Sequence, residues 1–279
     1  MPAGEQVVDD GTAASAAVDD LTVRDALVLH LRADSGVTLD ATGAVVTWQD
    51  ASSARHDASQ ADVEQRPFLV ADAVGGQPAA RFDGSGRFLR LAGRLLDSPQ
   101  CAVVAVATDQ GNGGHREIIS NWDGDAGNAG SSVFLGLTGE ATVRFTDARA
   151  QAGELAERHE PFVLTAVNAP GETAVYQNGG LLTRETSALP DRRLDTEWVI
   201  GQQGNINGEF WRGDIAEVIV YDRALSADEL ADVWNYLYAR YGIEKSSAHE
   251  ASLRDDPDYL ALVSLCHVLL NSNEFLYVD

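Results

Sequence analysis

The stretch that decides the fold runs from residue 213 to residue 230 and reads GDIAEVIVYDRALSADEL. Four consecutive apolar residues, 218–221, are typical of a strand that is buried on both faces. Ser226 and Glu229 have the spacing of a capping box, in which two side chains satisfy free amides at the start of a helix. The chain is therefore predicted to pass here from its last buried strand directly into a helix.

That helix has a clear apolar face and a clear end. The residues that recur at helical spacing on one face are Leu230, Val233, Trp234, Leu237 and Tyr241. Gly242 follows them and is a natural stop, because glycine readily adopts the left-handed conformation that closes helices. It is the one long helix predicted within the domain, and we expect it to cap a sheet.

Upstream of residue 213, short apolar segments alternate with turn signals. The apolar run CAVVAVA has the length and composition of a central strand that is buried on both sides. Many short strands without alternating helices predict an all-β fold, a two-sheet antiparallel jelly-roll sandwich. The predicted strands are 26–31, 45–48, 78–82, 87–91, 101–107, 117–120, 132–137, 141–145, 161–167, 173–177, 181–185, 197–201 and 214–222.

Two turns predict how neighbouring strands pair. Asn178-Gly179 tolerates the positive φ angles of a tight turn, which predicts a hairpin between 173–177 and 181–185. The sequence DGSG at 83–86 predicts a hairpin or close strand pair between 78–82 and 87–91.

The charge balance limits the partners of the chain. Lys and Arg number 20 against 43 Asp and Glu, a net charge of −23 over 279 residues. Such a chain repels nucleic-acid phosphates and anionic lipids, so we expect no nucleic-acid partner and no membrane insertion. The carboxylates could keep the surface solvated or could attract Ca²⁺.

The two cysteines, Cys101 and Cys266, lie far apart, and we expect buried thiols and no disulfide. Cys266 precedes His267, but Val263 breaks the CxxCH pattern, so no haem is expected.

The chain is predicted to have three parts. Residues 1–21 are small and acidic, which predicts a disordered leader without the apolar core of a signal peptide. Residues 22–243 form the jelly roll, and residues 244–279 form a linker and an apolar tail. The tail helix, 256–272, is apolar on more than one face, so we expect it to dock on another domain or chain.

Several segments resemble known families. LVLHLRAD (27–34), VTWQDAS (46–52), RPFLV (66–70), GGQPAARFDGSGRFLRL (75–91) and residues 213–230 resemble the bacterial laminin-G-like jelly rolls of the concanavalin A-like lectin/glucanase superfamily. The resemblance implies two packed sheets, often a calcium ion near one edge, carbohydrate or protein binding, and a periplasmic or cell-surface location. The tail DPDYLALVSLCHVLLNSNEFLYVD (256–279) resembles the end of a bacterial domain of unknown function that accompanies cytochrome-c-like domains.

The candidate ligand-binding residues lie in two polar loops that carry tryptophans. Indole rings stack on sugars, while amides and carboxylates bind their hydroxyl groups, and loops on a rigid sandwich are a common place for such sites. The candidates are Trp122, Asp123, Asn205, Asn207 and Trp211. Each tryptophan could instead be an ordinary core or rim residue.

Calcium is a second hypothesis. Asp83 follows a strand, and Glu217 lies on the closing strand, where the resemblance implies an acidic calcium ligand. Ala216 stands where many relatives have Asp, and two carboxylates do not supply the six or more oxygens that Ca²⁺ prefers. The alternative is that Glu217 pairs with an arginine and Asp83 caps a turn.

Catalysis is not expected. The glucanases of the resembled superfamily carry an E-x-D-x-x-E strand, and no segment here has that spacing. No HExxH pattern, GxSxG elbow or phosphate loop is present. The sequence therefore predicts a non-catalytic recognition module for carbohydrate or a protein partner, within an exported bacterial multidomain protein. The alternatives are a structural or docking module of a larger assembly and a divergent glycoside hydrolase.

Overall fold

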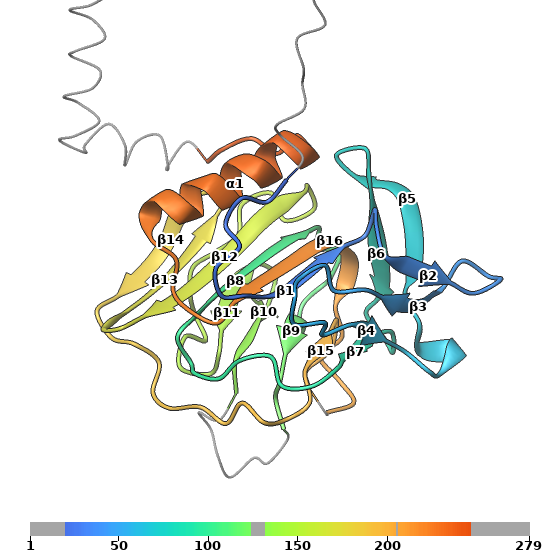
Figure 1. Cartoon of the computed structure of the whole chain (residues 1–279), viewed down its shortest axis with the longest axis horizontal. Helices are drawn as coiled ribbons and strands as arrows, with labels where there is room; N and C mark the ends of the chain where they lie inside the picture. The colour runs from blue at the N-terminus through green and yellow to red at the C-terminus, as the bar shows by residue number, and fades with distance from the viewer. Residues whose placement is uncertain (1–19, 124–131, 205, 247–279) are drawn as a thin grey trace, which may run out of the picture.

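The computed structural model describes residues 20–123, 132–204 and 206–246, and these form two eight-stranded antiparallel sheets packed face to face (Figure 1). In spatial order, sheet A contains β14 (Gly180–Glu185), β13 (Glu172–Gln177), β12 (Phe162–Ala169), β8 (Cys101–Ala107), β16 (Arg212–Tyr221), β6 (Gln77–Asp83) and β5 (Phe68–Val74), and β1 (Leu27–Arg32) also pairs with β16. Sheet B contains β11 (Thr142–Phe145), β10 (Phe134–Thr138), β9 (Arg116–Ser120), β15 (Val199–Ile200), β7 (Leu89–Leu91), β4 (Ala58–Ser59), β3 (Val45–Trp48) and β2 (Val37–Leu39). A short 3₁₀ helix, η1 (Val63–Gln65), precedes β5. The predicted two-sheet antiparallel sandwich is confirmed.

The centre of sheet A is the pair β8 and β16, as the apolar runs predicted. Alternate residues of β8 point to opposite faces, since side chains alternate along a strand. Val103 and Ala105 enter the core between the sheets, whereas Val104 and Val106 belong to a second apolar cluster on the other face. All seven residues of β8 are buried, so the strand needs cover on both sides.

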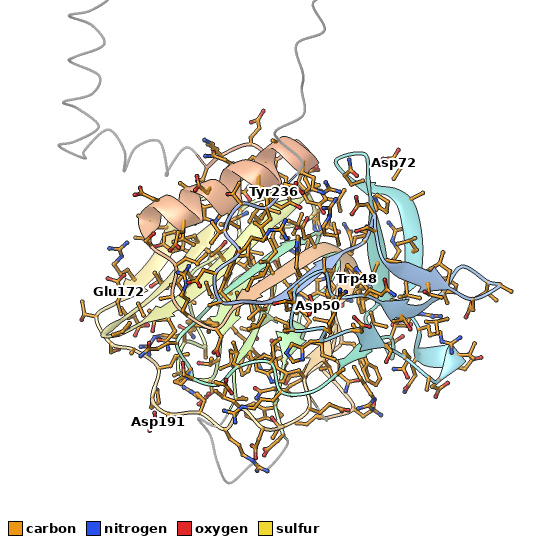
Figure 2. The ribbon with its side chains drawn as sticks, in the orientation of Figure 1. Trp48, Asp50, Asp72, Glu172, Asp191 and Tyr236 are labelled. Carbon is orange, nitrogen blue, oxygen red and sulfur yellow. The ribbon has the colours of Figure 1, made fainter. Side chains whose placement is uncertain are left out.

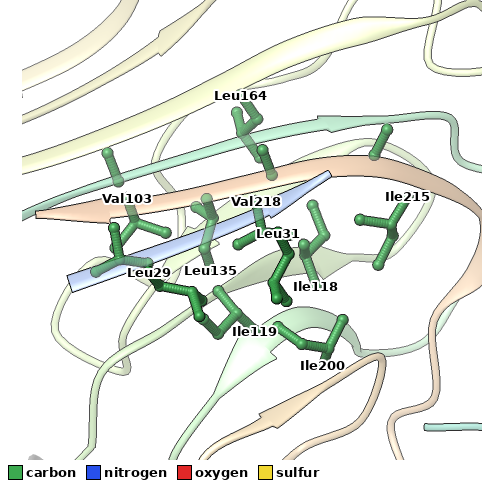
Figure 3. Packing of buried hydrophobic residues seen from close by; sticks show 14 of the residues in the cluster. Leu29, Leu31, Val103, Ile118, Ile119, Leu135, Leu164, Ile200, Ile215 and Val218 are labelled. Atoms are coloured by element: carbon green, nitrogen blue, oxygen red, sulfur yellow. The ribbon is translucent and has the colours of Figure 1, made fainter. Parts of the chain in front are cut away.

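The core between the sheets supplies the first cover. Figure 3 shows residues of both sheets meeting there. Trp48, Trp198 and Trp211 are among its largest fully buried side chains. Cys101 also lies here, and burial raises the pKa of its thiol to about 12, so the thiol is neutral at physiological pH.

The second cover is the helix α1 (Ala227–Tyr241), which lies across the outer face of sheet A (Figure 1). Its buried face includes every residue predicted for it, and the second cluster extends to Leu21 and Ile243. The capping box at Ser226 and Glu229 is present, and Gly242 ends the helix with a φ of 64°. The predicted bounds of the helix are confirmed because they depend on local chemistry.

The two turn predictions have different outcomes. The hairpin at Asn178-Gly179 is confirmed, with φ angles of 48° and 76°. The pairing of 78–82 with 87–91 is wrong, because β6 lies in sheet A and β7 in sheet B. Asp83 accepts hydrogen bonds from the amides of Ser85, Gly86 and Arg87, and the chain crosses there from one sheet to the other.

The charge lies mainly at the surface. Figure 2 shows Asp72, Glu172 and Asp191 on the outside of the molecule, while Trp48 lies within it. No helix among the described residues is long and apolar enough to cross a membrane. The leader 1–19 and the tail 247–279 lie outside the described residues.

Replacing Ser226 by Ala removes the hydroxyl that accepts the Glu229 amide. We expect the free energy of unfolding to fall by about 1 kcal/mol in urea denaturation, as is typical for loss of a cap. The matched control is Ser53→Ala at an exposed loop position, which should leave stability unchanged. Equal stability of the two variants would show that the capping box does not stabilise α1.

Candidate functional site

Strands β9, β10 and β11 carry a buried polar and aromatic layer on the outer face of sheet B, and the partly exposed residues Trp122 and Glu209 lie at its edge. Leu135 and Val143 point into the core, so Phe134, Gly136 and Arg144 point away from it. Register places Glu117, Gly136 and Arg144 in one row across the three strands. We name the set Glu117, Trp122, Phe134, Arg144 and Glu209 the outer-face site.

Gly136 makes room for the row. A Cβ atom at this position would lie 2.1 Å from Oε2 of Glu117 and 2.3 Å from the carbonyl oxygen of Arg116. Glycine therefore allows the Glu117 carboxylate to lie across β10 and reach Arg144, whose Nη1 donates to Oε1 of Glu117 at 2.9 Å. The same nitrogen donates to Oε2 of Glu209 at 3.2 Å.

The two carboxyl groups share one arginine and lie against each other. Burial raises the pKa of Glu117 well above its usual value; Arg144 opposes this and the neighbouring Glu209 carboxylate adds to it. The side chain of Glu117 is completely buried, whereas that of Glu209 is 23% exposed. Glu209 is thus the member of the pair that a ligand can reach.

An aromatic stack borders these charges. The guanidinium of Arg144 lies 4.8 Å from the ring centre of Phe134, a cation–π contact. Trp122 also contacts Phe134, edge to face at 6.1 Å between ring centres. Trp122 is partly exposed, and its indole N–H has no hydrogen-bond acceptor among the described residues.

The two tryptophan-bearing loops of the sequence do meet at this site. A Cβ on Gly204 would lie 1.8 Å from the carbonyl oxygen of Trp122, so only glycine allows this approach. Further along, Glu209 has a φ of 51°, a left-handed conformation that costs a residue other than glycine about 1–2 kcal/mol. Its carbonyl accepts the amide of Glu117 at 3.1 Å, which holds this backbone against β9.

The other predicted ligand-binding residues have different places. Asp123 is paired with Arg193 at 2.5 Å beside Trp122, and Asn207 is exposed on the second loop. Asn205 lies outside the described residues. Trp211 is completely buried in the core between the sheets, so it cannot contact a ligand at the surface, and its candidate role is corrected.

The two candidate metal ligands are not brought together. Asp83 pairs in register with Arg212, five residues from Glu217 on β16, which separates them by about 16 Å. Asp83 caps the turn already described and also pairs with Arg87. No group of three or more His, Cys, Asp and Glu side chains suited to a metal is found in the part of the chain that the structure describes.

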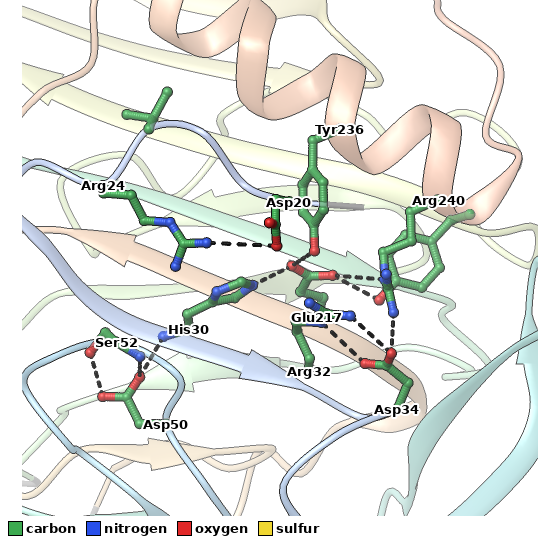
Figure 4. Close-up of polar contacts among 12 residues, drawn as sticks. Asp20, Arg24, His30, Arg32, Asp34, Asp50, Ser52, Glu217, Tyr236 and Arg240 are labelled. Atoms are coloured by element: carbon green, nitrogen blue, oxygen red, sulfur yellow. Dashed lines mark hydrogen bonds and ion pairs between the residues drawn. The ribbon is translucent and has the colours of Figure 1, made fainter. Parts of the chain in front are cut away.

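Glu217 has a structural role beneath α1. Figure 4 shows its carboxylate at the centre of a buried network. Tyr236 and Tyr241 donate to its two oxygens at 2.9 and 2.8 Å, and His30 Nε2 lies 2.7 Å from Oε1. Burial raises the pKa of both tyrosines above the usual range, so they remain donors. The network joins β1, β16 and α1.

A groove of about 610 Å³ opens elsewhere, at the end of α1. Polar and charged side chains such as Glu157, Glu160 and Lys245 line it, and it offers no exposed aromatic ring. The outer-face site is the better candidate because it combines an accessible ring with directed polar groups.

Sequence reasoning missed Glu117, Phe134, Arg144 and Glu209. Phe134 and Arg144 lie within predicted strands, where alternation could have placed them on the outer face once the direction of the core was known. Glu117 and Glu209 are far apart in sequence, so nothing local relates them.

Comparison with known protein families gives one match. The family described as Concanavalin A-like lectin/glucanases superfamily matches residues 83–231. No curated protein sequence matches the chain.

Three solved structures are similar. A GH54 α-L-arabinofuranosidase, soaked with a cyclic sulfate inhibitor, is 13% identical with a TM-score of 0.54; the match covers 78% of this chain and 60% of that one. The binding domain of Paraclostridial mosquitocidal protein 1 is 14% identical with a TM-score of 0.52, covering 77% and 53%. Domain 4 of AbnA, an extracellular GH43 arabinanase of Geobacillus stearothermophilus, solved with arabinotriose, is 16% identical with a TM-score of 0.48, covering 74% and 97%. The chain thus spans a little over half the length of the first two, and the likeness to these two shows a shared fold.

Replacing Glu217 by Ala leaves the tyrosine hydroxyls and His30 without their buried acceptor. We expect the free energy of unfolding to fall by about 3 kcal/mol, as for other broken buried charge networks. The matched control, Glu172→Ala, removes a carboxylate whose side chain is 40% exposed and should change stability little. A loss for Glu217→Ala no greater than that of the control would contradict the structural role.

Proposed function

Because the chain belongs to the concanavalin A-like lectin/glucanases superfamily, we propose that it is a non-catalytic module that binds carbohydrate at the outer-face site. One observation carries the proposal: a row of contacts, Trp122 to Phe134 to Arg144 to Glu209, has a partly exposed indole ring at one end and a partly exposed carboxylate at the other. The apolar face of a sugar ring fits an indole, and its hydroxyl groups are donors for a carboxylate.

A further feature supports this binding mode. Arg144 and Phe134 fix the ring and the carboxylate from below, so the site is already formed without ligand. Preorganised groups lose little conformational entropy on binding.

The geometry of the carboxyl pair favours binding over glycoside hydrolysis. Glycosidases hold two carboxyl groups about 5–9 Å apart, on either side of the scissile bond. Here Glu117 and Glu209 contact each other and share Arg144, and Glu117 is completely buried. A sugar cannot enter between them.

We also propose that the module works outside the cytoplasm, as part of a larger exported protein. The support is its family, for which the resemblance of the sequence implies a periplasmic or cell-surface location. The alternative, a structural docking module that uses the tail helix 256–272, rests on residues outside the described part of the chain.

A glycan array with and without Ca²⁺ tests the proposal. We expect Trp122→Ala to weaken binding of the retained oligosaccharides at least about tenfold, or about 1.4 kcal/mol. The control is Phe68→Ala, which removes a partly exposed aromatic ring on β5 of sheet A and should leave binding unchanged. Absence of binding to every glycan in both conditions, or equal binding by the two variants, would contradict the site.

Hydrolysis of the same oligosaccharides is measured by release of reducing ends. We expect none from the purified chain. Release that is lost in Glu117→Gln but kept in the exposed control Glu172→Gln would show that the pair is catalytic instead.

A further inference from the structure

The Glu117 and Glu209 carboxyl groups share one arginine nitrogen. Arg144 is the one cation in contact with both carboxyl groups among the described residues. Arg116 is near Glu117, but its guanidinium donates to both oxygens of Asp109 at 2.7 Å, and Arg158 pairs with the same carboxylate. Two ionised carboxylates on one arginine nitrogen repel each other, and the complete burial of Glu117 makes its ionised form costly.

The hydrogen bonds of the pair point to a bound proton. Oε2 of Glu117 is buried and has no N–H or O–H donor among the described residues. The Glu209 carboxyl contacts the Glu117 carboxyl, and it can form a hydrogen bond with it only if one of the two is protonated. Such a shared proton would satisfy the buried oxygen and remove the repulsion between the two carboxylates.

The shared proton also affects how firmly the backbone of residues 206–210 is held. Glu209 sits in a left-handed conformation and is held there by its carbonyl on the Glu117 amide and by its carboxylate on Arg144. Phe210 packs against Phe88 at 6.5 Å between ring centres. Repulsion between the two carboxylates would act directly on the strained residue.

We propose that one proton shared by Glu117 and Glu209 holds the 206–210 segment against sheet B, so that the outer-face site is complete in acid and loosens as the pH rises. The inference rests on the proposed function for its effect on binding, but the proton and the segment are properties of the unliganded chain. It makes the module a binder that holds its ligand more tightly as the pH falls.

The direction of the pH dependence follows from the pKa of Glu117 in the folded and unfolded chain. Burial, with the Glu209 carboxylate adding to it, raises the pKa of Glu117 in the folded chain above its unfolded value. The stabilisation from this group is therefore complete below the unfolded pKa and is lost as the pH rises through the folded pKa. The groups that face Glu117 are Arg144 from β11, Arg116 from β9 and Glu209 from the segment itself.

Hydrogen exchange of the whole chain without ligand tests the proposal. Peptides covering 206–210 are compared at pH 5 and pH 8 after correction for the intrinsic exchange rate. We expect protection in the wild type to fall at least about tenfold, the equivalent of one pKa unit. In Glu117→Gln the amide donates permanently in place of the proton, so protection should be independent of pH.

The control Glu172→Gln on β13 should behave as the wild type. If Glu117→Gln does not fold, Glu209→Gln supplies the same donor from the other side. Equal protection of the wild type at both pH values, or the same loss in the wild type and both glutamine variants, overturns the proposal. Because no glycan is present, failure here leaves the carbohydrate proposal standing, and a negative array leaves the shared proton standing. A glycan that is retained on the array at pH 5 and released at pH 8 would show that the shared proton controls carbohydrate binding.

Discussion

The burial of β8 and β16 on both faces is the constraint on which the rest of the structure depends. One face of each strand belongs to the core between the sheets, and the other must be covered from outside. Helix α1 supplies that cover and is joined to β16 through Glu217. With the outer face of sheet A covered by α1, the described part of the chain presents a partly exposed ring and a partly exposed carboxylate at the edge of the buried layer on the outer face of sheet B.

The outer-face site is assembled by contacts between side chains on neighbouring strands and loops. Glu117 reaches Arg144 because Gly136 leaves a gap in the strand between them. Arg144 then positions Glu209 and supports Phe134, against which Trp122 packs. Each contact crosses from one strand or loop to the next, so the site exists only when the register of three strands is correct.

Features that depend on neighbouring residues could be predicted from the sequence. Ser226 and Gly242 delimit α1 by local hydrogen bonds, and Asn178-Gly179 forms its hairpin by local backbone preference. Predictions that needed the path of the chain failed. DGSG at 83–86 looks like a hairpin turn, but it is a crossing between sheets, because both flanking strands face the core from opposite sides.

The site residues were only partly predictable, because some of them depend on local sequence and others on contacts between distant segments. Trp122 was predicted as a ligand-binding residue because a large aromatic side chain is uncommon in a polar loop. Trp211 met the same criterion, yet it is a core residue. Glu117 and Glu209 could not be related from the sequence, because they meet only when β9 and the segment before β16 pack together. A pair of carboxyl groups made by tertiary contact leaves no spacing pattern.

The most direct test of the account is a crystal structure of the chain with an oligosaccharide retained on the array. We expect a sugar ring against the indole of Trp122 and a hydroxyl group of the oligosaccharide donating to Glu209. A ligand bound instead in the groove at the end of α1, between Glu157 and Lys245, would contradict it.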